Sequence, residues 1–254
     1  MRPNRVREIA RAGGAAMNGW CGIPAPYAAE LLGHAGYDCV TVDMQHGLIG
    51  FETAAAMLQA ISATPAQPLL RVRSNDPGLV MQALDAGAYG VICPLVNSAE
   101  EARRFSEACR YGPRGGRSFG PARGMLYGGP DYFDRANDEV LALAMIETRG
   151  GVAEIDAILA LPEIDGVFVG PNDLCIEMGE RPSSEPEAGT RAGTAIAHVL
   201  ARSRAAGKIA GIFCSDGPAA GRRAKEGFQL VNPGYDVGFL AGGARANLAA
   251  ARNV

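Results

Sequence analysis

Short apolar segments alternate with segments of helical periodicity along almost the whole chain. The apolar segments are rich in Val, Ile and Leu and are bounded by turn residues, as is typical of buried strands. The segments between them place apolar side chains at 3.6-residue spacing, as Phe51, Ala54, Leu58 and Ile61 illustrate. Strands are predicted at residues 15–21, 39–44, 68–72, 89–95, 141–146, 166–169, 209–213 and 229–232.

Two of the predicted helices have clear start signals. Asp76 precedes a proline at the first helical position, and Ser98 has Glu101 as its capping-box partner. Helices are predicted at residues 27–36, 51–61, 77–86, 98–109, 152–160, 194–206, 219–226 and 239–253.

Eight apolar strands that alternate with amphipathic helices in about 250 residues indicate an α/β fold of the (β/α)₈ TIM-barrel type. An open doubly wound sheet is the alternative, but no G-x-G-x-x-G turn follows the first predicted strand. No internal boundary is evident, so residues 1–254 are predicted to form one domain.

One stretch breaks the alternation. Residues 110–130 are rich in Gly and Arg and follow neither period, which predicts a long loop. Because residues 114–130 follow the fourth predicted strand, we expect them to shape a substrate pocket.

Composition excludes several classes of protein. The chain is 48% hydrophobic and 20% charged with a net charge of −3, which is ordinary for a globular protein and gives no basic footprint for nucleic acid. Neither a secretory signal nor a membrane-spanning apolar run is evident, so we expect no membrane partner. The six cysteines form no C-x-x-C pair, which favours a reduced, cytoplasmic protein.

Candidate chemistry lies where predicted strands end. Glu147 and Asp173 follow successive strands, so both carboxylates could reach one divalent ion, and two oxygen ligands with open positions suit Mg²⁺ or Mn²⁺. The alternative is a solvated Glu147 and an Asp173 that caps the following helix.

His46 and Arg71 also lie at strand ends. His46 would suit a general base, and Arg71 would hold a carboxylate or a developing enolate oxygen. The alternatives are a hydrogen-bonded structural histidine and a surface arginine. Alternation turns Arg73 to the same side as Arg71, so the strand pattern leaves the choice between them open.

Several segments, in their order along the chain, resemble one known family: VDMQHG, LLRVRSNDP, ALDAGAYGVICPLVNSAEEA, CRYGPRGGRSFG, MIETRGGVAEIDAILALPEIDGVFVGPNDL and GKIAGIF. They are similar to the HpcH/HpaI aldolases, which are class II, metal-dependent pyruvate aldolases. The run from IET to GPNDL is the most specific part.

The resemblance implies a function and a set of roles. The chain would cleave a 4-hydroxy-2-oxoacid reversibly to pyruvate and an aldehyde with Mg²⁺, Mn²⁺ or Co²⁺, as a homohexamer, a trimer of dimers that exchange C-terminal helices. The implied roles are metal ligation by Glu147 and Asp173, catalysis by His46, enolate stabilisation by Arg71, support of the histidine's basicity by Asp85, and binding of the pyruvate carboxylate by the backbone amides of Asn172 and Asp173.

Two departures from the family pattern concern the pocket. Met145 replaces the usual Gln, and Gln45 replaces the usual Glu, so the range of aldehydes is expected to differ. Other functions considered are a related metal-enolate lyase, such as an acyl-CoA lyase or oxaloacetate decarboxylase, and a non-catalytic oxyacid-binding barrel. Schiff-base catalysis is disfavoured because the two lysines, Lys208 and Lys225, stand away from predicted strand ends.

Overall fold

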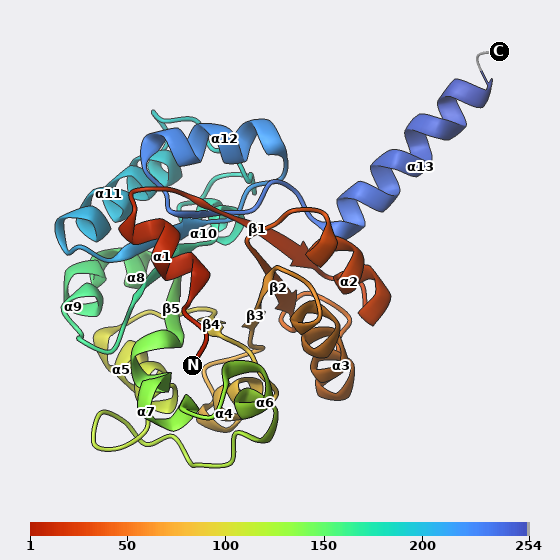
Figure 1. The fold of residues 1–254 in the computed structure, drawn as a ribbon. Helices are drawn as coiled ribbons and strands as arrows, with labels where there is room; N and C mark the ends of the chain where they lie inside the picture. Colours follow the sequence, from red (N-terminus) through yellow and green to blue (C-terminus); the bar gives the residue numbers. More distant parts are fainter. Residues whose placement is uncertain (253–254) are drawn as a thin grey trace.

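A computed structural model describes residues 1–252, which form a closed barrel of eight parallel strands in sequential order (Figure 1). The predicted (β/α)₈ architecture is therefore confirmed. The strands are β1 (Ala16–Cys21), β2 (Cys39–Asp43), β3 (Gln67–Arg71), β4 (Gly90–Cys93), β5 (Leu141–Ile146), β6 (Gly166–Val169), β7 (Ile209–Ile212) and β8 (Leu230–Val231).

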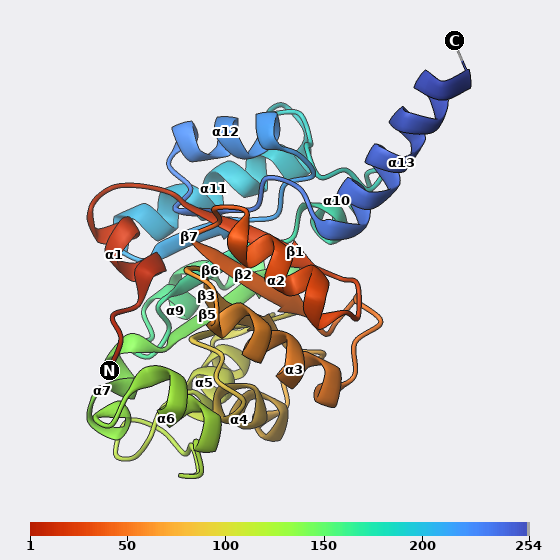
Figure 2. The same cartoon turned by 45° about the vertical axis from the view of Figure 1, so that its right-hand side comes forward.

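Helices surround this barrel, as Figures 1 and 2 show from two directions. They are α1 (Arg5–Arg11), α2 (Pro26–His34), α3 (Phe51–Ser62), α4 (Pro77–Asp85), α5 (Ala99–Ala108), α6 (Ala122–Gly128), α7 (Tyr132–Glu139), α8 (Arg149–Ala153), α9 (Ile155–Leu159), α10 (Pro171–Glu177), α11 (Arg191–Ala205), α12 (Gly217–Glu226) and α13 (Asp236–Arg252). The predicted caps hold: Asp76 accepts the amides of Gly78 and Leu79, and Ser98 accepts that of Glu101.

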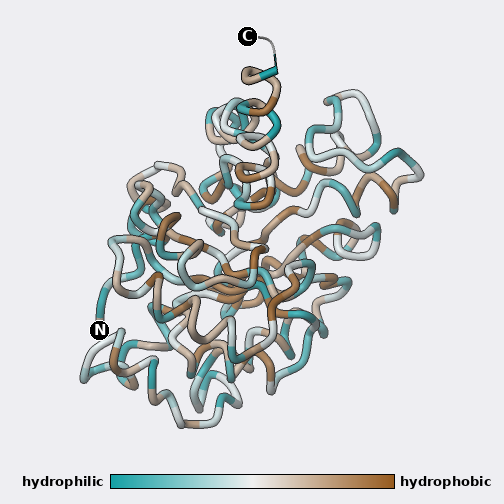
Figure 3. Tube along the Cα trace, turned by 90° about the vertical axis from the view of Figure 1, so that its right-hand side faces the viewer, coloured by the Kyte–Doolittle hydropathy of each residue, from teal (hydrophilic) through white to brown (hydrophobic). Residues whose placement is uncertain are grey.

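The apolar side chains form two layers. The larger layer lies between strands and helices, where alternate strand residues such as Val40, Val91 and Val167 pack outward. The smaller layer fills the barrel interior with the other set, including Leu69, Leu143 and residues from most of the other strands. Figure 3 shows the hydrophobic parts of the chain gathered toward this centre. A barrel filled by side chains leaves its functional groups at the rim.

Helices depart from prediction in several places. Residues 110–130 are not a continuous loop, because α6 lies inside them, with Gly124 and Gly128 buried and Tyr127 packed edge-on against Tyr89 at 5.0 Å. Tertiary packing thus overrides a glycine-rich composition that disfavours helices. The helix predicted at residues 152–160 is two short helices, α8 and α9. Helices α1 and α7 were not predicted, and α10 was considered only as the helix that Asp173 might cap.

The last helix stands apart from the barrel. In Figures 1 and 2, α13 projects away from the body of the molecule, and it exposes Phe239, Leu240 and Leu248. The predicted end of this helix at Asn253 lies outside the described residues. Within residues 1–252, the structure contains no helix with the length and hydropathy needed to cross a bilayer.

Candidate active site

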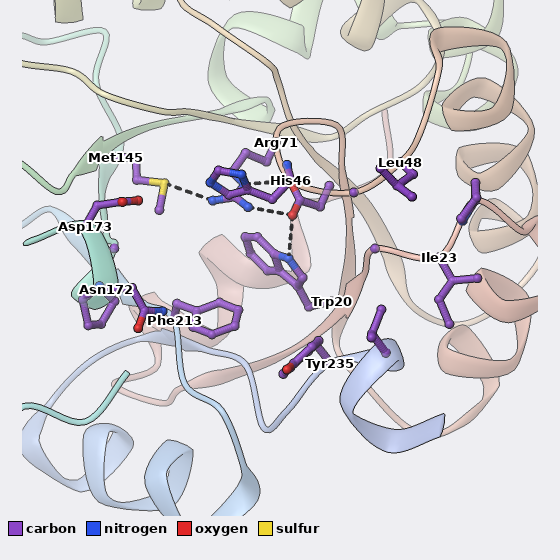
Figure 4. Close-up of a pocket in the computed structure, with 17 residues that line it drawn as sticks. Trp20, Ile23, His46, Leu48, Arg71, Met145, Asn172, Asp173, Phe213 and Tyr235 are labelled. Carbon is purple, nitrogen blue, oxygen red and sulfur yellow. Dashed lines mark hydrogen bonds and ion pairs between the residues drawn. The ribbon is translucent and has the colours of Figure 1, made fainter. Parts of the chain in front are cut away.

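A cavity of about 500 Å³ opens at the carboxyl ends of the strands (Figure 4). Elements from opposite sides of the barrel contribute to it: β1 to β3, β5, α10, the end of β7 and the start of α13. It is lined by Trp20, Gly22, Ile23, Pro24, Asp43, His46, Gly47, Leu48, Arg71, Met145, Gly170, Pro171, Asn172, Asp173, Phe213, Tyr235 and Val237.

Strand alternation places functional side chains on the inner face. On β5, Leu141, Leu143 and Met145 belong to the interior layer, and Glu147 comes next in the same alternation. On β3, Leu69 lies in that layer and Arg71 follows two residues later. The apolar interior therefore ends in charged groups at the rim.

Arg71 forms a buried ion pair. Its Nε and Nη2 atoms donate to the two carboxylate oxygens of Asp43 at 2.8 and 2.6 Å, and its side chain is 7% exposed. Although burial alone would raise the pKa of Asp43, the hydrogen bond and charge of Arg71 hold it below its usual value. Arg73, by contrast, is exposed and donates to the carbonyl oxygen of Ile49. The structure thus distinguishes the two arginines, because Arg71 lines the cavity.

Two side chains beside Arg71 were not predicted as site residues. The indole ring of Trp20 lies 4.9 Å from the guanidinium carbon, and its Nε1–H donates to Asp43 at 3.2 Å. Asp43 is the second of these residues. The available signal was positional: Trp20 occupies an inward position near the end of β1, and Asp43 ends β2.

Glu147 is a fully buried carboxyl group. Its Oε1 accepts the backbone N–H of Leu95 at 2.8 Å, whereas Oε2 has no hydrogen-bond partner among residues 1–252. Burial, together with the nearby charge of Asp173 and against the effect of the Leu95 amide, raises its pKa to about 7. Gly170 lies against this group, since an added Cβ would overlap Oε2. The carboxylate of Glu147 is thus tightly packed, and one of its oxygens is free of hydrogen bonds to the described residues.

The donor set fits a hard divalent cation. Asp173 lies in the first turn of α10 and lines the cavity; the cap of that helix is Gly170, so the alternative of Asp173 as the cap was wrong. An unpaired buried oxygen on Glu147, with a second carboxylate nearby, is the environment that a cation stabilises. No group of three His, Cys, Asp or Glu side chains in the described chain is arranged for a metal. Such an ion would keep coordination positions for water and substrate.

His46 and Asn172 both line the cavity from exposed positions. The backbone N–H of His46 donates to Asp43 Oδ1 at 3.3 Å, which fixes the turn after β2. In the view of Figure 4 the imidazole of His46 overlaps the guanidinium of Arg71, and both residues line the cavity. The imidazole therefore shares a pocket with the buried arginine and a carboxylate.

The far end of the cavity is apolar and includes the base of α13. Phe213 lines the cavity beside Asn172, whereas the far end includes Tyr235 and Val237. Between the last two, the Asp236 carboxylate accepts the amides of Gly22 and Ile23, each at 2.9 Å, and so ties α13 to the loop after β1.

Glu147 is fully buried and is not among the residues that line the cavity, and two further sequence-predicted features also lie outside it. Asp85 ends α4, and its carboxylate pairs with Arg117 at 2.9 Å. None of residues 114–130 lines the cavity, so the expectation that they shape this pocket is not met within one chain. Lys208 lies just before β7, at the opposite end of the barrel from the cavity, where its ammonium group donates to the carbonyl of Leu161.

Known proteins share both the sequence and the fold. The chain is 45% identical over 249 residues to a hydroxypyruvate/pyruvate aldolase from Rhizorhabdus wittichii, covering 98% of this chain and 99% of that protein. It is 38% identical to a 4-hydroxy-2-oxo-heptane-1,7-dioate aldolase from Salmonella paratyphi C, covering 96% and 92% of the two chains.

A solved structure agrees with these relatives. The crystal structure of an HpcH/HpaI aldolase/citrate lyase family protein from Burkholderia cenocepacia superposes with a TM-score of 0.87 at 32% identity, covering 97% of this chain and 98% of the other. The model of the HpcH/HpaI aldolase/citrate lyase family matches residues 19–242. The resemblance noted from the sequence is confirmed, and this chain belongs to the HpcH/HpaI aldolase/citrate lyase family.

Proposed function

We propose that this chain is a metal-dependent pyruvate aldolase that cleaves a 4-hydroxy-2-oxoacid reversibly to pyruvate and an aldehyde. The observation that carries the proposal is the unpaired carboxylate oxygen of Glu147, close to Asp173 at the cavity that Arg71 lines. The relatives named as aldolases, which are similar over nearly their whole length, support the same reaction class.

Carbon–carbon cleavage places negative charge on the 2-oxo oxygen of the pyruvate unit. A divalent ion held by Glu147 and Asp173 would supply Lewis-acid stabilisation of that charge. Arg71 adds a fixed cation that Asp43 and burial hold in place, so little reorganisation is needed as charge develops. We assign to Arg71 the stabilisation of this oxygen.

The other end of the bond requires a proton acceptor. The 4-hydroxyl group of the substrate loses its proton as it becomes the aldehyde oxygen, and His46 lines the cavity from an exposed turn where it can exchange that proton with solvent. We therefore assign His46 as the general base in cleavage and the general acid in condensation.

The two ends of the substrate would contact surfaces of different polarity. Asn172 and Asp173 lie on the charged side, where we assign the pyruvate carboxylate to the backbone amides at the start of α10. Ile23 and Leu48 lie toward the other side, where the aldehyde chain would contact mainly apolar surface. Met145, which stands where the family commonly has glutamine, places a thioether on the charged side, against Nη1 of Arg71.

The decisive experiment measures pyruvate release from 4-hydroxy-2-oxo-heptane-1,7-dioate, with and without a chelator. We expect activity that EDTA abolishes and Mn²⁺ or Mg²⁺ restores. A His46→Ala variant should lose about 100-fold or more in kcat, whereas His198→Ala, which removes an exposed histidine of α11, serves as the matched control with unchanged activity. Turnover that survives chelation, or no turnover of any 4-hydroxy-2-oxoacid, would contradict the proposal.

We also propose a cytoplasmic homohexamer, a trimer of dimers. All six cysteines are free and buried, which suits a reducing compartment. The projecting α13 exposes apolar side chains that a second copy would cover, in line with the helix exchange implied by the resemblance. The role of Asp85 in supporting His46 stays a prediction, because within one chain its carboxylate is paired with Arg117.

A further inference from the structure

We infer that Trp20 is a positioning residue for the reaction: it holds the guanidinium of Arg71 in the one orientation that aims its Nη1 edge at the substrate. This inference rests on the proposed aldolase function. It concerns a strand side chain with 3% exposure whose sequence context indicated only a buried aromatic residue.

The indole ring restrains Arg71 from one face. The guanidinium carbon lies 4.9 Å from the ring centroid, within the range of a cation–π contact. In Figure 4 the indole lies directly beside the guanidinium group, between Arg71 and Tyr235. Moving the guanidinium away from the ring would lose this contact, so the indole restrains the position of Arg71.

The same indole also restrains the counter-ion. Its Nε1–H donates to Asp43 Oδ2 at 3.2 Å, and that oxygen also accepts Nη2 of Arg71 at 2.6 Å. Trp20 therefore contacts both partners of the ion pair. Rotation of the Asp43 carboxylate would break the indole hydrogen bond as well as the two bonds to Arg71.

What remains of the guanidinium is its Nη1 edge. Nε and Nη2 are occupied by Asp43, whereas Nη1 contacts the Met145 sulfur at 3.6 Å. A thioether is a weak acceptor, so a charged substrate oxygen would displace it readily. Since Asp43 takes the Nε hydrogen and one Nη2 hydrogen, the Nη1 hydrogens and the second Nη2 hydrogen, at the free end of the guanidinium, are left for the developing oxyanion.

Trp20 is itself fixed by aromatic neighbours. Its ring is stacked on Phe168 at 5.6 Å and meets Phe213 edge-on at 5.5 Å. Phe168 is a buried residue of the barrel interior, whereas Phe213 lines the cavity. The orientation of Arg71 is thus anchored in the barrel core rather than in a loop.

Two substitutions separate the two contacts of Trp20. Trp20→Phe keeps an aromatic ring beside Arg71 but removes the N–H group, and Trp20→Leu removes both. Since a charge-assisted hydrogen bond and a cation–π contact each contribute on the order of a tenfold factor, we expect kcat to fall about 10-fold in Trp20→Phe and about 100-fold in Trp20→Leu. KM should change by less than threefold, because the restraint acts on transition-state charge.

A matched control removes a similar contact far from the cavity. Arg2 lies over the ring of Tyr127 at 4.7 Å, and Tyr127→Leu should leave kcat unchanged whatever it does to thermal stability. Wild-type kcat in both Trp20 variants would overturn the inference. A rise in KM alone would also overturn it, since that would indicate simple substrate contact.

A second test needs no variant, because Trp20 is the only tryptophan of the chain. Oxalate, a planar mimic of the pyruvate enolate, should change the indole fluorescence saturably in the presence of Mn²⁺, with a Kd that matches its inhibition constant. Inhibition by oxalate without any change in fluorescence would overturn the inference. If the wild-type protein cleaves no hydroxyoxoacid, the proposed function fails instead, and the inference falls with it.

Discussion

Arg71 and Asp43 are register partners on neighbouring strands, and two hydrogen bonds of 2.8 and 2.6 Å join their side chains in the wall of the cavity. A buried ion pair of this kind contributes little net stability, because both groups lose their hydration. What it provides is a cation with a fixed direction at the site of charge development. The strand pairing of the barrel thus sets the geometry of the candidate active site.

Asp43→Asn should weaken both stability and activity. Asparagine has nearly the same shape but no charge, so Arg71 would remain buried without a counter-ion. We expect the free energy of unfolding to fall by about 3 kcal/mol and kcat/KM to fall roughly 100-fold. Urea denaturation and steady-state kinetics would measure the two effects.

The control for that variant is an exposed ion pair. Asp156 and Arg202 are paired on the surface, so Asp156→Asn should cost less than about 1 kcal/mol and leave activity unchanged. Equal losses in the two variants would show that the Asp43–Arg71 pair has no special role.

The same pair predicts a dependence of stability on pH. Burial would raise the pKa of Asp43, but Arg71 and the amides of His46 and Gln45 lower it below the usual carboxyl value. The pair therefore stabilises the fold fully above the unfolded-state pKa of about 3.9, and this stabilisation is lost as pH falls through the lower folded-state pKa. The difference in unfolding free energy between wild type and Asp43→Asn should be constant above about pH 5 and shrink in acid. Denaturation curves at several pH values test this, and a difference that grew toward low pH would refute it.

Gly170→Ala should impair metal binding. The added Cβ would overlap Oε2 of Glu147, so the carboxylate would have to move from its present position. We expect the affinity for Mn²⁺, measured by calorimetry, to fall at least about 10-fold, as for other losses of ligand orientation.

Gly221→Ala provides the matched control, because no residue in the described range 1–252, outside the adjoining turns of α12 itself, lies within 4 Å of the added atom. That variant should keep its metal affinity and gain about 0.5–1 kcal/mol of stability from helix propensity. Unchanged Mn²⁺ affinity in Gly170→Ala would argue against Glu147 as a ligand.

Charged residues on α13 should disrupt assembly. Leu240 and Leu248 are 67% and 51% exposed on the projecting helix. If a second copy covers them, a Leu240→Glu/Leu248→Glu variant buries two charges in the interface and should dissociate at micromolar concentration. Sedimentation velocity would measure the change, with Arg252→Glu on the same helix as a control for charge. An assembly that survives the double substitution would exclude this face as the contact.

The strands could be predicted because each is a short buried run, and closed parallel barrels make such runs apolar on both faces. The sequence of β5 illustrates this, since all six residues are buried. The helix α6 could not be predicted, because its sequence has two glycines and its stability comes from Tyr127 packing on Tyr89, which is distant in the chain.

Some residues of the candidate site could be predicted from the sequence and others could not, for a physical reason. Glu147 and Arg71 continue an inward alternation at the ends of strands, so period-two reasoning places them at the rim. The link between Asp43 and Arg71 depends instead on the register of β2 against β3, which one strand's pattern does not contain. Trp20 was not predicted for the same reason, since its contact with Arg71 joins β1 to β3 across β2.

The carboxylate of Asp236 joins the first turn of α13 to the loop after β1, and both segments border the apolar end of the cavity. If α13 is held by another subunit, mutations that alter how subunits meet will also alter which aldehydes fit. Quaternary architecture and substrate preference would then be inherited together, and paralogues that diverge in one should diverge in the other.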